Sequence, residues 1–193
     1  MLTVLQLFVL DDSTSMRPSW GRVEKLFQAL AYVVKAADPD GLELYFTSEH
    51  SRPHKNKNSG PLVELIKKRP WSGLTGICNM RLCLDHIVEK VVASNIQGKQ
   101  TSGWPSKLGR SNPSPSRPIS IYILTNGTWD SPGESLYGTD KAIMRLIKAL
   151  EASGKSVSHV ALQFIRFGED GNGKWRLDQL DDMAKHSPDT VTM

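Results

Sequence analysis

Three oxygen-bearing side chains, Asp11, Ser13 and Ser15, occupy every second position directly after the apolar run "VLQLFVL". In a partly extended loop this spacing aims all three at one point, whereas Asp12 and Thr14 face the other way. One carboxylate and two hydroxyls are hard ligands of low charge, suited to a magnesium ion that keeps several waters or to manganese. Serine and aspartate before a helix are equally ordinary N-terminal caps. The stretch alone therefore leaves a cation site and a helix cap as alternatives.

Two further oxygen-rich loops follow at points where strands or helices are expected to end or begin. Thr75 lies in the glycine-flanked stretch "SGLTG", just before an expected helix, and Thr125 and Asn126 end the apolar run "ISIYIL". The carboxyl ends of parallel strands meet at one edge of a sheet, where ligands bind. Three such loops are more than helix capping requires, so the pattern favours a cation site.

The elements that must position these loops alternate between apolar runs and helical periodicity, which indicates an α/β fold with a buried, mostly parallel sheet. Strands are predicted over 3–10, 42–47, 119–124 and 157–168. Helices are predicted over 20–37, 62–68, 79–93 and 140–152, with a final helix around 177–183. A helix should follow the turn at Asp170, where Lys174 and Trp175 break the pattern of a calcium-binding loop. Cys78 and Cys83 are expected as reduced thiols on one helix.

The length of 193 residues fits a single domain over 1–193. Residues 96–117 are rich in Ser, Pro, Gly and basic residues and contain no acid, which predicts a disordered insertion. The chain ends in "DTVTM", a candidate edge strand, with no room for a helix after it. The first apolar run is too short to cross a membrane and lacks the flanks of a signal peptide, so we expect a soluble, cytoplasmic protein with no membrane partner.

The order of the motifs "FVLDDSTSM", "GLTG", "IYILTNG" and "LQFIRFG" resembles that of a von Willebrand factor A-type domain, especially its fungal intracellular branch. The resemblance covers almost the whole chain. It implies a Rossmann-like three-layer α/β/α fold, with a mostly parallel sheet flanked by helices on both faces. By this resemblance, we expect the final helix of the family fold to be missing from this sequence.

The same resemblance implies a metal-ion-dependent adhesion site that holds Mg²⁺ or Mn²⁺. Carried over by position, its metal residues are Asp11, Ser13, Ser15 and Thr75, with Asn126 where the family usually has aspartate. In the family, the hydroxyls contact the metal, the carboxylates hold it mainly through water, and an acidic side chain of a protein partner completes the site. An amide brings no charge, so a weakened site and a site that has lost its metal both remain open.

These features favour non-catalytic protein–protein recognition, as a scaffold or assembly module. The main alternative is binding of nucleic acid or another polyanion through loops 52–69 and 99–117, in which Trp104 could stack on a base. The basic residues of these loops are Arg52, Lys55, Lys57, Lys67, Lys68, Arg69, Lys99, Lys107, Arg110 and Arg117. A metal-dependent hydrolase is the least favoured alternative, because such a site usually holds several carboxylates or histidines and only Asp11 is firmly placed.

Overall fold

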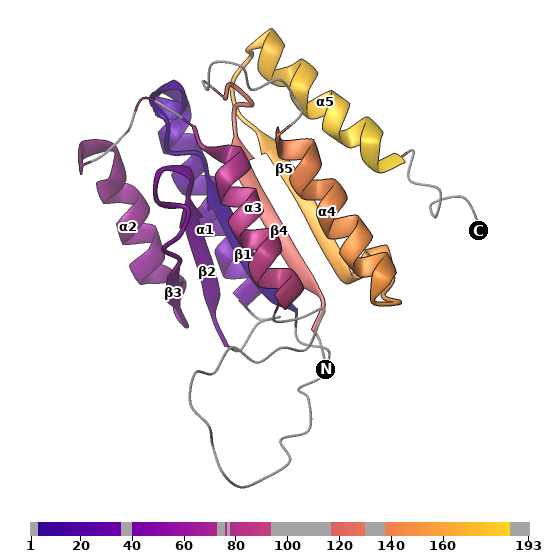
Figure 1. Ribbon diagram of the computed structural model, residues 1–193. Helices are drawn as coiled ribbons and strands as arrows, with labels where there is room; N and C mark the ends of the chain where they lie inside the picture. Colours follow the sequence, from indigo (N-terminus) through magenta and orange to yellow (C-terminus); the bar gives the residue numbers. More distant parts are fainter. Residues whose placement is uncertain are drawn as a thin grey trace, which may run out of the picture.

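The computed structural model describes residues 4–35, 40–72, 76, 78–93, 117–129 and 138–185. Its centre is a five-stranded sheet in the order β3-β2-β1-β4-β5 (Figure 1). The strands are β1 (Leu5–Leu10), β2 (Leu42–Phe46), β3 (His54–Asn56), β4 (Ile119–Thr125) and β5 (Val160–Arg166). Only β3 runs antiparallel to its neighbour, so the ends of the other strands share one edge of the sheet.

Helices cover both faces of this sheet, which gives the three layers of a Rossmann-like α/β fold (Figure 1). The helices are α1 (Trp20–Val34), α2 (Ser59–Ser72), α3 (Met80–Val91), α4 (Thr139–Ala152) and α5 (Gly171–Lys185). Side chains of α1 and α2 pack on one face, and those of α3, α4 and α5 on the other. The predicted fold class is confirmed.

Alternating residues of β1 supply both cores, which explains why its sequence is apolar throughout. Leu7 and Val9 belong to the core under α3 and α4, whereas Phe8 and Leu10 belong to the core under α1. The Phe8 ring meets Phe27 of α1 edge to face at 4.9 Å between ring centres. This double-sided burial fixes where β1 ends and therefore where Asp11 lies.

Several elements differ from the sequence prediction. The strand predicted over 157–168 is shorter, because Val157–His159 form a 3-10 helix and β5 spans Val160–Arg166. The structure has the strand β3 where the sequence predicts a loop. Its residues, His54–Asn56, are polar and form a short edge strand with no apolar alternation. Helix α2 is longer than the predicted 62–68, since Pro61 lies in the first turn, where a missing backbone N–H breaks no helical hydrogen bond.

Two other predictions concern positions rather than whole elements. Cys78 and Cys83 are both buried free thiols, but Cys78 precedes α3 instead of lying on it. The turn at Asp170 opens α5 as expected, with the Asp170 carboxylate accepting the Gly173 N–H at 2.7 Å.

Several predicted features fall on residues that the structure does not describe. They are Thr75, nearly all of the 96–117 insertion, and the edge strand at 189–193. Within the described ranges, none of the helices combines the length and the apolar character needed to cross a membrane.

Candidate cation site

Asp11 lies directly after β1, at the edge of the sheet where the parallel strands end. Its backbone N–H donates to the Leu124 carbonyl at 3.0 Å, which extends the β1–β4 ladder by one residue. The side chain is completely buried. One carboxylate oxygen accepts the Ser13 N–H at 3.1 Å and the other accepts the Thr125 hydroxyl at 2.7 Å. The carboxylate is thus fixed by the two loops that follow β1 and β4.

Ser13 and Ser15 lie side by side, with 2.9 Å between their hydroxyl oxygens. Ser13 occupies the position before a short 3-10 helix, Thr14–Ser19, yet its side chain makes no capping hydrogen bond. The alternative that Ser13 is a helix cap is therefore not realised in this structure. The Ser13 hydroxyl and the Asp11 carboxylate are both buried, so this polar group is shielded from bulk water.

The Asp11 carboxylate lacks a charged partner in the described part of the chain, where the ion pairs involve other acids. Burial raises the pKa of Asp11 above its usual value, although hydrogen bonds from Ser13 and Thr125 partly offset this effect. A buried carboxylate held only by neutral donors is an unfavourable arrangement that a cation would relieve. The chemistry of Asp11 and its two neighbouring hydroxyls therefore fits a hard divalent cation.

Cys78 completes the buried surroundings of Asp11. Its thiol hydrogen-bonds the carboxylate, and burial together with the Asp11 charge raises the pKa of Cys78 well above its usual value. Among the described residues, no group of three His, Cys, Asp or Glu side chains is placed to hold a metal. Any cation here would depend on hydroxyl ligands, as magnesium and manganese sites can and zinc sites rarely do.

Asp12 points away from this cluster, as the alternating spacing predicts. It is fully buried and accepts the Thr47 hydroxyl at 3.0 Å and the Ser48 N–H at 2.9 Å. Arg69 of α2 donates to it through Nε at 2.9 Å and Nη2 at 2.7 Å. With its oxygens held by these donors, Asp12 serves to tie β1, β2 and α2 together.

Asn126 lies beside the cluster, but its side-chain oxygen is already engaged. The Oδ1 atom accepts the Thr128 N–H at 2.9 Å and the Thr128 hydroxyl at 2.6 Å. Among the described residues, no hydrogen bond joins Asn126 to Asp11, Ser13 or Ser15. The structure thus brings three of the five predicted ligands together, leaves Asn126 turned into its own loop, and does not describe Thr75.

Sequence reasoning placed Thr125 at a strand end but did not identify it as the partner of Asp11. The contact follows from the strand register, which the sequence alone does not show: Leu10 lies opposite Leu124, so the next residues, Asp11 and Thr125, meet. Arg69 was missed as a structural ion-pair residue because it lies 57 residues from Asp12 and was counted with the basic loop.

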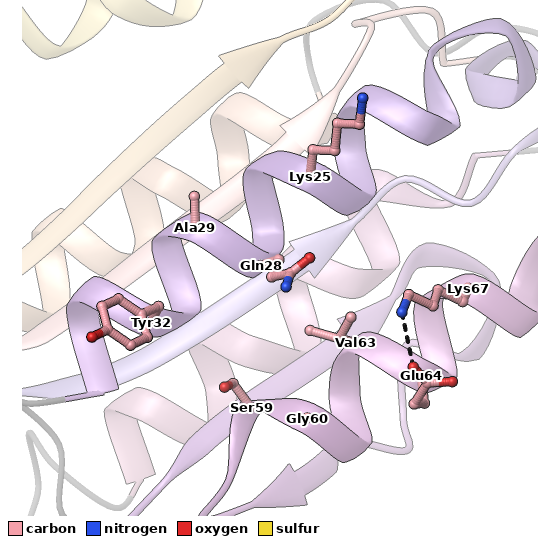
Figure 2. Close-up of a pocket in the computed structure, with 9 residues that line it drawn as sticks. All are labelled: Lys25, Gln28, Ala29, Tyr32, Ser59, Gly60, Val63, Glu64 and Lys67. Carbon is pink, nitrogen blue, oxygen red and sulfur yellow. Dashed lines mark hydrogen bonds and ion pairs between the residues drawn. The ribbon is translucent and has the colours of Figure 1, made fainter.

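A separate hollow of about 630 Å³ lies between α1 and α2 (Figure 2). Residues of the two helices, including Gln28, Tyr32 and Val63, face one another across it, and the ion pair of Lys67 with Glu64 closes part of one side. None of the four predicted metal residues that the structure describes lines this hollow. It is therefore distinct from the cluster at Asp11.

Comparison with known proteins finds no family model and no curated protein that matches the chain. Among solved structures, proximal thread matrix protein 1 from the mussel byssus is 16% identical with a TM-score of 0.45, over 92% of this chain and 41% of that one. The pilus adhesin SpaC from Lactobacillus rhamnosus GG, in its open conformation, is 10% identical with a TM-score of 0.45, over 95% of this chain and 30% of that one. The chain thus spans less than half the length of either protein, and similarity at this level assigns it neither a family nor a function.

Proposed function

We propose that this protein is a non-catalytic protein-recognition module of the von Willebrand factor A type. In this proposal a divalent cation, Mg²⁺ or Mn²⁺, is held at the end of β1 and binds an acidic side chain of a protein partner. The observation that carries the proposal is the Asp11 carboxylate, which is completely buried and lacks a cationic partner in the described ranges. The two serine hydroxyls beside it supply the remaining ligand chemistry.

The proposed ligands have different roles. Asp11, Ser13 and Ser15 would hold the ion, and the resemblance adds Thr75 and Asn126. The ion would supply a positive charge at the sheet edge, to which a carboxylate from the partner is attracted. Because Asn126 is neutral and its oxygen accepts two hydrogen bonds, the ion should be weakly held until that carboxylate arrives.

The surroundings of Asp11 favour recognition over hydrolysis. A hydrolase needs a general base or a metal-activated water held by several strong ligands. The described neighbours of Asp11 are hydroxyls and the Cys78 thiol, whose raised pKa keeps it protonated and poorly nucleophilic.

Calorimetric titration of the protein with MgCl₂ and with MnCl₂, each with and without acetate, tests this proposal. We expect weak binding of both ions that tightens in acetate, because acetate mimics the acidic side chain of the partner. The variant Asp11→Asn is expected to bind neither ion. If the unaltered protein shows no heat of binding up to millimolar metal, in the presence or absence of acetate, the proposed cation site is wrong.

A further inference from the structure

We infer that Gly173 and Arg176 of α5 are positioning residues, which hold the Asn126–Gly127 turn against the end of the sheet. This inference rests on the proposed function for its consequence, because Asn126 is one of the proposed metal residues. The contact that α5 makes with the turn is independent of that function and can be tested by itself.

The backbone of Gly173 touches the turn so closely that no side chain fits between them. A Cβ atom added at Gly173 would lie 2.1 Å from the Asn126 carbonyl oxygen, and one added at Gly127 would lie 2.5 Å from the Gly173 carbonyl oxygen. The obstructing atoms are all backbone, so relief requires the helix or the turn to move. Gly127 also has a φ of +77°, a conformation in which a side chain is strained.

Arg176 fixes the same turn from one helical turn further along α5. Its Nη1 atom donates to the Gly127 carbonyl at 2.9 Å. The first turn of α5 is in turn held by Asp170, whose carboxylate accepts the Gly173 N–H. Both the start of α5 and the Arg176 guanidinium therefore contact the turn.

Inside the turn, hydrogen bonds link this contact to the Asp11 cluster. Gly127 N–H donates to the Thr125 hydroxyl at 3.0 Å, and that hydroxyl donates to Asp11 at 2.7 Å. A displaced turn would therefore disturb the Asn126 side chain and the donor that fixes Asp11. Residues that orient metal ligands in this way typically change metal affinity about 10- to 100-fold when they are replaced.

The chain offers a matched pair of variants for the test. Gly173→Ala places a methyl group against the Asn126 carbonyl, whereas Gly171→Ala, two residues earlier on the same helix, meets nothing within 4 Å. Arg176→Ala removes the donor to Gly127, and Arg176→Lys keeps a positive charge and a donor. Two readouts are used for each variant: amide hydrogen exchange by NMR without metal, and Mn²⁺ affinity by electron paramagnetic resonance.

We expect Gly173→Ala and Arg176→Ala to speed exchange of the Gly127 and Thr128 amides selectively, relative to amides of β1 and β2. Gly171→Ala should not, and Arg176→Lys should restore part of the protection. Mn²⁺ affinity should fall about tenfold or more in the same two variants. The two readouts can also disagree. If both variants speed exchange selectively but the unaltered protein does not bind Mn²⁺, the positioning role is supported and the proposed cation site is refuted.

Three results would overturn the inference. The first is exchange at Gly127 and Thr128 that is unchanged in Gly173→Ala and Arg176→Ala. The second is equal acceleration at all amides, since that would indicate general destabilisation rather than positioning. The third is Mn²⁺ affinity that is the same in Gly173→Ala as in Gly171→Ala, provided that the unaltered protein binds the ion.

Discussion

Ser13 is a serine at a helix start that does not behave as a cap. Its backbone is extended, with a φ of −71° and a ψ of 161°, as a cap residue should be, yet its hydroxyl pairs with Ser15 instead of the first helical turn. A cap hydrogen bond normally contributes about 0.5–2 kcal/mol to stability. Ser13 makes no such hydrogen bond. The effect of removing its hydroxyl therefore tests whether Ser13 contributes to stability alone or also to metal binding.

Replacing Ser13 with alanine should lower the free energy of unfolding by about 1 kcal/mol without metal, because the buried hydroxyl hydrogen-bonds Ser15 and Asp11. With magnesium, the variant should lose most of the metal-dependent stabilisation, which for the unaltered protein is about 2.7 kcal/mol when magnesium exceeds Kd about 100-fold. Urea unfolding with MgCl₂ and with EDTA measures both values. Thr14→Ala, the neighbouring exposed position, is the control and should keep the magnesium effect. A loss of equal size in EDTA and in MgCl₂ would mean that the Ser13 hydroxyl does not contribute to metal binding.

Asn126→Asp adds a carboxylate at the position where the resemblance implies one. The new side chain can still accept both hydrogen bonds from Thr128, so the turn should be preserved. We expect magnesium to bind about tenfold more tightly, or ~1.4 kcal/mol, because the ion then interacts with a second negative charge. Acetate should enhance binding less than in the unaltered protein. Calorimetry that shows no gain in magnesium affinity would mean that position 126 does not contribute to the ion.

At the scale of elements, the loops at the sheet edge are held by a buried ion pair. Arg69 reaches from α2 to Asp12 after β1 and to Glu49 after β2, and its guanidinium lies 4.2 Å from the centre of the Phe46 ring. Asp12 is fully buried, and Arg69 is a cationic partner within hydrogen-bond distance. The contact links three elements that are far apart in the chain.

The variant Arg69→Met should destabilise the fold by about 3–5 kcal/mol, since it leaves a buried carboxylate without its cation. Lys67→Met on the same helix removes an exposed pair with Glu64 and should leave the denaturation midpoint nearly unchanged. Chemical denaturation of the two variants side by side measures the difference. Similar midpoints for both would show that Thr47 and Ser48 alone suffice to hold Asp12.

A second ion cluster, built on the buried carboxylate of Glu43, connects β2, β3 and α3. Burial by itself would raise the pKa of Glu43, but hydrogen bonds and charges from Lys55 and Lys90 outweigh it and hold this pKa below its usual value. Tyr45 also donates to the Glu43 carboxylate at 3.1 Å. This arrangement favours the ionised form of Glu43 in the folded protein.

A lowered pKa in the folded state gives a pH dependence of defined sign. The contribution of Glu43 is fully present above the pKa of glutamate in the unfolded chain and is lost as pH falls through the lower, folded-state pKa. Urea unfolding between about pH 6 and pH 3 should therefore show a smaller loss of stability in Glu43→Gln than in the unaltered protein. Glu64→Gln, in a solvent-screened pair, should change the slope much less. Equal slopes for Glu43→Gln and the unaltered protein would contradict this role.

At the scale of the whole molecule, the net charge is +4, but several cations of the basic loops are paired with acids and are less available to an anionic partner. Four cations of the basic loops lie in ion pairs: Lys55 with Glu43, Lys67 with Glu64, Arg69 with Asp12 and Glu49, and Arg117 with Asp40. Polyanion binding depends on cations that can release counterions from phosphates. The pairing weakens the case for loop 52–69 as a phosphate-binding face.

We therefore expect a gel-shift assay with DNA and RNA to show weak binding that disappears as salt rises toward physiological strength. Arg52 and Lys57 are exposed residues of this loop. Replacing both with alanine should have little effect on metal binding. Retention of a submicromolar complex at physiological salt would instead favour nucleic-acid binding as the principal function.

The sequence by itself determined the architecture and the position of the first oxygen-rich loop. Apolar runs such as residues 4–10 are buried on both faces, which only a covered, mostly parallel sheet provides, so β1, β2 and β4 could be predicted. The two-residue spacing also separated Asp11 and Ser13 correctly from Asp12, because side chains alternate in an extended backbone. Ser15 lies beside Ser13 for another reason, since it belongs to the 3-10 helix Thr14–Ser19 and not to an extended loop.

Only the tertiary structure decided which neighbours these residues have. Asp12 pairs with Arg69 and Asp11 with Thr125, contacts that span 57 and 114 positions and leave no local pattern in the chain. The absence of a cap bond at Ser13, among the described residues, likewise follows from where the Ser15 hydroxyl lies. The backbone contact of Gly173 with Asn126 could not be predicted, since a glycine in a helix carries no sequence signal for what it touches. Such contacts depend on the packing of complete elements, which local residue preferences do not determine.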